Sequence, residues 1–142
     1  MNCLDLAVVL GEKVDRASAT LPQTTTQALF AISGGRVVIT SLFGTVTVTT
    51  GALSSGQVVA NPTVGTVFVL ANESVSGESP GFMISFPGTG VAWLRGVIGE
   101  TCRPLILREG TIDFETNVSV VGEMSWTLTY VALDEGATVV AV

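Results

Sequence analysis

The density of β-branched residues constrains the fold of this chain more than any other feature of its sequence. Valine, threonine and isoleucine number 22, 18 and 6, so 46 of the 142 residues belong to the class that packs best on a pleated sheet. Sixteen glycines and five prolines divide these residues into short runs. Short β-branched runs between turn residues are typical of an all-β sandwich or barrel, and not of alternating strands and helices.

Two segments show the period-two alternation of strands that bury one face. Val46 and Val48 fall on one side of residues 45–49, and threonines fall on the other. The segment 124–130 places Met124, Trp126, Leu128 and Tyr130 on one face and small polar residues on the other. This alternation predicts antiparallel strands with one buried face.

Glycines mark two further expected features. Gly34-Gly35 predicts a tight hairpin turn between neighbouring strands, and Gly44 predicts a bulge or bend within a long strand that begins near residue 36. The other expected strands are 27–33, 57–60, 66–72, 82–86, 91–98, 104–109 and 110–116.

The first 22 residues differ from the rest of the chain and end at Pro22, a residue that stops regular structure. We therefore predict an N-terminal arm over residues 1–22 and one β domain over residues 23–142. The predicted fold is an all-β, antiparallel, jelly-roll-like sandwich with that arm. No run of apolar residues reaches the ~18–20 that a spanning helix needs, and the start carries Asp5 where a secretion signal has basic residues. We expect a protein that is neither inserted in a membrane nor secreted.

The charge of the chain argues against several function classes. Six basic and twelve acidic residues give a net charge of −6, which is opposite to what a nucleic-acid binder needs. The sequence has no histidine, the commonest general base and metal ligand. Residues 37–94 carry only Glu73 and Glu78. Because soluble surfaces normally mix charges of both signs, we expect part of this region to be buried in a homo-oligomer, although threonine, serine and glutamine could also supply a neutral polar surface.

The candidates for chemistry are few. Asp113 and Glu115 lie two apart on an expected strand and project from the same face, as a pair of hydrolytic carboxylates would. The apolar residues beside them favour a simpler interpretation, an amphipathic strand with its polar side in water. Cys3 and Cys102 lack the number and spacing of a disulfide scaffold or zinc site, and no nucleotide-binding or calcium-binding motif is present. We expect no catalytic residue, cofactor or metal.

Aromatic and basic residues suggest two modes of binding. Trp93, Trp126 and Tyr130 could form a stacking platform for sugar rings, but the strand periodicity of the last two favours the core. Lys13 and Arg16 in the expected arm could contact an acidic partner, or could simply be solvated.

Two parts of the sequence resemble a known group of proteins. They are ATLPQTTTQALFAISGGRVVITSLFGTVTVTT (residues 19–50) and GTIDFETNVSVVGEMSWTLTYVALDEGATVVAV (residues 110–142), about half of the chain together. Both are similar to small virion proteins of tailed bacteriophages that are encoded among head genes.

The resemblance implies a non-enzymatic structural role on the outer surface of the capsid. A head-decoration, cement or head-fibre protein would be made in the cytoplasm of the host bacterium, would form a homo-oligomer, in all expectation a trimer, and would bind the major capsid protein. The docking residues would lie around the end of the arm: Lys13, Arg16, Leu21, Pro22 and Gln23. The alternatives are a carbohydrate- or receptor-binding β-sandwich module and a structural protein of the tail or connector.

Overall fold

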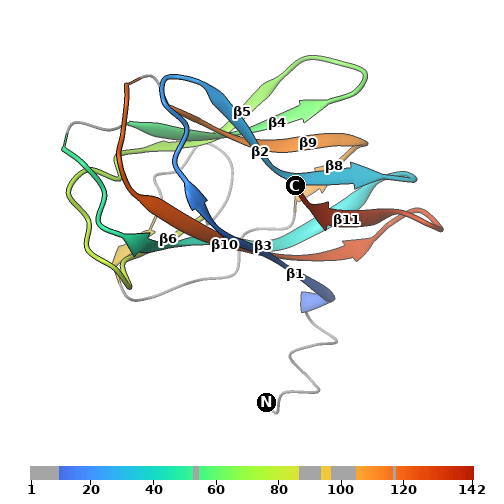
Figure 1. The fold of residues 1–142 in the computed structure, drawn as a ribbon. Helices are drawn as coiled ribbons and strands as arrows, with labels where there is room; N and C mark the ends of the chain where they lie inside the picture. Colours follow the sequence, from blue (N-terminus) through green and yellow to red (C-terminus); the bar gives the residue numbers. More distant parts are fainter. Residues whose placement is uncertain (1–9, 53–54, 87–93, 97–104, 117) are drawn as a thin grey trace, which may run out of the picture.

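The computed structural model describes residues 10–52, 55–86, 94–96, 105–116 and 118–142. The described part of the chain forms eleven strands in two layers packed face to face (Figure 1). The strands are β1 (Glu12–Thr20), β2 (Thr26–Ser33), β3 (Val37–Val48), β4 (Gly56–Pro62), β5 (Phe68–Glu73), β6 (Met83–Ser85), β7 (Leu94–Gly96), β8 (Leu105–Leu107), β9 (Gly110–Thr116), β10 (Glu123–Ala132) and β11 (Thr138–Ala141).

All strand pairs within the two sheets are antiparallel. One sheet has the order β1-β10-β3-β6-β7, with β8 also paired to β3, and the other has the order β11-β2-β9-β4-β5. The predicted antiparallel β-sandwich is therefore confirmed. The predicted strand at 91–98 is described only as β7, and its other residues lie outside the described ranges, as do Trp93, Cys3 and Cys102.

The segment predicted as an arm contributes a strand to the sandwich. Residues 12–20 form β1, which pairs along β10 from Glu12 opposite Tyr130 to Thr20 opposite Glu123. This differs from the expected boundary at residue 22, because the β body begins about ten residues earlier. The alternation of this strand was obscured by Arg16, a charged residue at a position that faces inward and is buried.

The turn at Gly34-Gly35 is present, but it does not make a hairpin. Both glycines have positive φ values, 76° and 137°, as the prediction of a tight turn requires. However, β2 and β3 lie in different sheets, so the turn carries the chain from one layer to the other. The connection from β10 to β11 crosses between the same sheets beside it, and Arg36 binds Asp134 across the two turns. The predicted hairpin is therefore wrong.

The core contains an aromatic pair that joins the two sheets. Phe114 of β9 and Trp126 of β10 lie with ring centroids 5.2 Å apart and planes tilted by 50°, a favourable arrangement for aromatic rings. Each ring lies over a glycine of the next strand. A Cβ atom on Gly44 would lie 3.0 Å from the Trp126 ring, and one on Gly56 would lie 2.3 Å from Cζ of Phe114.

Gly44 therefore has a packing role, and the predicted bulge at this position is wrong. It pairs directly with Trp126 in an uninterrupted part of the ladder, whereas the irregularities between β3 and β10 lie elsewhere, between Glu123 and Met124 and between Thr129 and Tyr130. A glycine in a strand often marks a place where another group approaches closely, and here that group is an indole ring.

Candidate functional site

The two long sides of the sandwich differ, and the open side carries the candidate site. On one side, the edge strands β1 and β11 approach each other and are linked through Arg16. On the other side, β5 ends one sheet, and β8 lies across from it on β3 of the other sheet.

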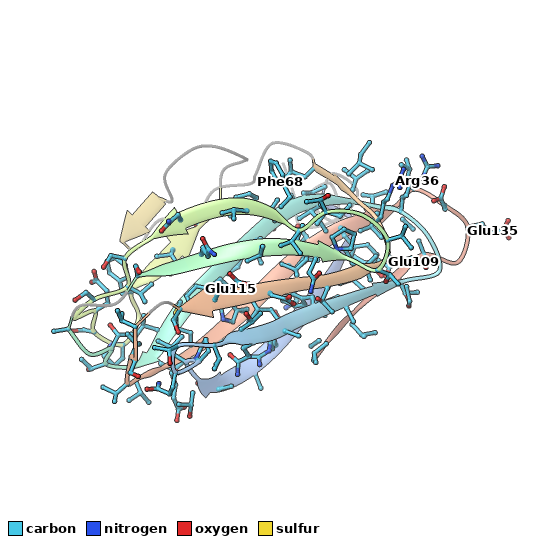
Figure 2. All side chains as sticks on the ribbon, turned by 90° about the horizontal axis from the view of Figure 1, so that it is seen from above. Arg36, Phe68, Glu109, Glu115 and Glu135 are labelled. Carbon is cyan, nitrogen blue, oxygen red and sulfur yellow. The ribbon has the colours of Figure 1, made fainter. Side chains whose placement is uncertain are left out.

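Exposed apolar side chains gather on this open side. The apolar rim, as we name it, consists of Val64, Val67, Phe68, Val69 and Ile106, which are 77%, 51%, 58%, 46% and 61% exposed. These five are nearly half of the twelve large exposed hydrophobic residues in the described chain. Figure 2 shows Phe68 at the edge of its sheet, away from Glu115 and Glu135. Phe68 and Ile106 line one groove and Val64 lines a neighbouring hollow, whereas Phe68 and Val69, consecutive in β5, point to opposite faces of the sheet. Exposed apolar residues gathered along one edge mark an interaction site more often than isolated ones do.

A groove of about 330 Å³ lies beside the rim. One wall comes from β4 and β5, with Ala60, Phe68 and Leu70, and the other comes from β8, with Leu105, Ile106 and Leu107. Most of this lining is apolar, and Arg108 is the one charged side chain among the residues that line it in the described chain. The groove suits an apolar side chain of a partner better than a polar substrate.

The residues of the rim were not among those predicted from the sequence to bind a partner. The signal of the rim was the unbroken apolar run from Val67 to Leu70, in which alternation fails because residues on both sides of the strand are apolar. The sequence predicts a strand over 66–72, and the structure places β5 at the edge of its sheet.

Arg16 closes the opposite side of the sandwich. Its side chain is 8% exposed, and Nε donates a hydrogen bond of 2.8 Å to the main-chain oxygen of Val142. Nη1 has no hydrogen-bond partner among the described residues. Burial lowers the pKa of this guanidinium, because the charged form loses solvation. Arg16 therefore joins β1 to β11, and its charge is not displayed for docking as predicted.

Three other predicted docking residues also have structural contacts. Leu21 is 3% exposed and lies in the core. The carbonyl of Pro22 accepts a hydrogen bond of 2.7 Å from the hydroxyl of Thr116, and the side-chain amide of Gln23 donates to the carbonyls of Leu21 and Val120. These contacts fix the connection between β1 and β2 against the segment after β9.

Gln23 is exposed although its amide is hydrogen-bonded, and Lys13 is exposed as well. Its ammonium lies 2.7 Å from a carboxylate oxygen of Asp15, and both side chains are more than half exposed. The hydrogen bond from Lys13, with a second from Thr127, lowers the pKa of Asp15. A pair this exposed adds little to stability and leaves the lysine accessible.

The two candidate carboxylates do share the outer face of β9, but their environments differ. Glu115 accepts hydrogen bonds from Gln57 at 2.6 Å and from Thr26 at 3.1 Å, on the strands to either side. Asp113 is only 4% exposed, and one of its oxygens accepts a hydrogen bond from Asn61 at 3.2 Å. The interpretation that this polar face lies in water is therefore wrong for Asp113.

Both oxygens of Glu115 are engaged by neighbouring strands, and the second oxygen of Asp113 is buried with no partner in the described structure. The described residues also contain no cluster of three or more His, Cys, Asp or Glu side chains able to hold a metal ion.

The aromatic platform is not formed by Trp126 and Tyr130. Each is 2% exposed and belongs to the core, as their strand periodicity indicated. The Tyr130 hydroxyl donates a hydrogen bond of 2.8 Å to Glu12 on β1. Burial, and then this hydrogen bond, raises the pKa of Tyr130.

A charged corner lies next to the groove. Arg36 and Asp134 form a two-point contact, with Nε and Nη2 of the arginine 2.8 and 2.6 Å from the carboxylate oxygens. This contact lowers the pKa of Asp134 to about 2. Arg108 and Glu109 line the same hollow, so the corner carries both positive and negative charges.

Comparisons with family models, with curated protein sequences and with solved structures found no match to this chain. No helix in the described part of the chain is long and apolar enough to cross a membrane.

Proposed function

We propose that this protein is a non-enzymatic structural protein of a tailed-bacteriophage virion. In this proposal it decorates the outer surface of the capsid as a cement protein, acts as a trimer, and binds the major capsid protein. The resemblance of residues 19–50 and 110–142 to small head-gene proteins suggests the virion, and the antiparallel β-sandwich suits a body that must resist unfolding and proteolysis.

The apolar rim is the observation that carries the proposal. A small domain that works alone in water does not gain from five large hydrophobic side chains on one edge, because exposed apolar patches promote association. The same side chains are useful in a protein that spends its working life covered by neighbours. The low charge of residues 37–94, which include β5 and the rim residues from Val64 to Val69, supports the same interpretation.

In this proposal the protein stabilises the capsid by binding to it, without a chemical reaction. A ligand that binds an assembled shell, and not the free or unexpanded subunits, stabilises that shell by mass action in proportion to RT ln(1 + [L]/Kd). Each copy that bridges adjacent shell subunits adds contact that exists only in the assembled state, and repeated contacts from one trimer act together.

Contacts within the sandwich favour one of the proposed docking residues over the others. Leu21, Pro22 and Arg16 are engaged within the sandwich, whereas Lys13 lies at the exposed edge of the sheet on β1. We therefore assign electrostatic contact with the acidic surface of a shell to Lys13. A carbohydrate-binding role would need a platform other than Trp126 and Tyr130, since both are buried.

Co-sedimentation tests the proposal. Purified protein is mixed with heads of the phage that encodes it, after the protein has been removed, and binding is measured over a range of concentrations. The proposal predicts saturable binding to expanded heads and weaker binding to unexpanded ones. Lys13→Gln should reduce the affinity, and Lys13→Arg serves as the matched control. Protein that stays in the supernatant with expanded heads would contradict the proposal, and immunogold labelling of virions separates a head location from a tail one.

A further inference from the structure

We propose that copies of this chain associate with one another through the apolar rim, so that the partner that covers Val64, Val67, Phe68, Val69 and Ile106 is a second copy of the same protein. The inference rests on the proposed function, because it assigns this surface to the contact between copies and leaves the shell to another face. It follows from the area, the charge and the shape of the rim.

The area is sufficient to begin an interface. At the fractions exposed, the five residues present on the order of 500 Å² of surface in total, divided between the two faces of β5, the turn before it and the neighbouring strand β8. A stable interface buries about 800 Å² on each partner. The exposed uncharged residues between the rim side chains, Thr63, Gly65 and Thr66, supply further surface of the same kind.

The scarcity of charged residues makes the rim a more favourable surface for self-association than the other faces of the protein. A chain with a net charge of −6 repels its own copies wherever carboxylates would meet. Residues 37–72, which supply the rim except for Ile106, contain no charged residue. Glu109 and Asp134 line the hollow beside Val64 together with Arg108 and Arg36, and Glu73 lies at the far end of β5. Two rims can therefore meet without placing uncompensated acids against each other.

The shape provides a ridge beside a hollow. In the part of the chain that the structure describes, β5 pairs only with β4, so its outer edge is open to another chain. The 330 Å³ groove lies directly beside this edge. Apolar side chains of one copy can therefore fill the groove of the next, and a head-to-tail contact of this type is what a closed ring of three requires.

Light scattering coupled to size exclusion tests the inference on the full chain. The wild-type protein should run as an oligomer, with a trimer at three times 14.6 kDa, or about 44 kDa. Val64→Asp adds a charge at a side chain that is 77% exposed, so it leaves the fold intact while placing acids at the contact. Phe68→Ser removes apolar area from the middle of the rim. Each should weaken association at least about tenfold.

Val140→Ser is the matched control, because Val140 is 53% exposed on β11, on the opposite side of the sandwich. It should leave the oligomer unchanged, and circular dichroism should show the same fold in all variants. A wild-type monomer at high micromolar concentration would overturn the inference, and so would an oligomer that survives both rim substitutions. Neither result bears on binding to heads, which co-sedimentation measures separately.

Discussion

Substitution of Gly56 by alanine should destabilise the protein substantially, although alanine is normally the better residue in a strand. The new Cβ atom would lie 2.3 Å from Cζ and 2.7 Å from Cε2 of Phe114, whereas ordinary contacts begin near 3.4 Å. Phe114 is fully buried and stacks on Trp126, so its ring cannot move away into solvent. Overpacking of a core costs about 1–3 kcal/mol of stability. Alanine lowers the conformational entropy of the unfolded chain relative to glycine, which stabilises the folded protein by roughly 0.5–1 kcal/mol. The difference spans about 0–2.5 kcal/mol, and because the Cβ would lie only 2.3 Å from Cζ we expect a loss in the upper part of that range, about 1–2 kcal/mol.

Urea denaturation of the two proteins measures this loss, and a thermal scan should show Tm lower by about 3–6 °C. Gly51→Ala is the control. Its Cβ would come within 3.0 Å of Cγ2 of the exposed residue Val121 and at ordinary contact distances, 3.5 and 3.9 Å, from the main-chain N and O of the same residue, so the change should be nearly neutral. Phe114→Leu should lose less stability in the Gly56→Ala background than in wild type, because the two residues share one space. Equal stability of Gly56→Ala and wild type would refute this account of the core.

Three further results follow from the electrostatics. Arg36 lowers the pKa of Asp134 from 3.8 to about 2. The ion pair therefore stabilises the fold fully above pH 3.8, and this stabilisation is lost as the pH falls through about 2. NMR titration of Asp134 should give a midpoint near 2 that moves towards 3.8 in Arg36→Gln. The free energy of unfolding of Arg16→Met, measured in urea, should lie within about 1 kcal/mol of wild type, because removal of an unpartnered buried N–H offsets the lost hydrogen bond. Arg16→Ala also loses the packing of the aliphatic part of the side chain and should be clearly less stable. Asp113→Asn should keep the hydrogen bond with Asn61 and should unfold at a urea concentration no lower than wild type. A decrease of more than about 1 kcal/mol in the free energy of unfolding would show that the buried oxygen of Asp113 has a partner.

The fold class could be predicted from the sequence because alternation is a local property. Met124, Trp126, Leu128 and Tyr130 share a buried face as predicted, and β9 and β10 occupy the expected segments. Which strand pairs with which is not local. The turn at Gly34-Gly35 is compatible both with a hairpin and with a change of sheet, and the pairing of β2 with β9 and of β3 with β10 decides between them.

Two strands were missed for different physical reasons. β1 was missed because a buried arginine breaks its apolar pattern, and the partner that tolerates Arg16, the carbonyl of Val142, lies 126 residues away in the sequence. β11 (Thr138–Ala141) is short and lies at an edge, with only one strand beside it to stabilise it.

The candidate site was predicted less well than the fold. The low charge of residues 37–94 predicts that part of this region is buried in a homo-oligomer, and most of the rim lies within this range. The sequence could not identify Phe68 as exposed, because an apolar strand looks the same at the edge of a sheet as at its centre. Conversely, Leu21 and Pro22 were predicted to be docking residues on the basis of their place in an arm, whereas the structure engages both in the body.

The most direct test of the central claim is the binding of the purified protein to stripped, expanded heads, measured together with the stability of the heads to heat or chelation. The proposed role predicts saturable binding at a fixed ratio to shell subunits and heads that withstand higher temperature once the sites are filled. Heads that neither retain the protein nor gain stability would contradict it.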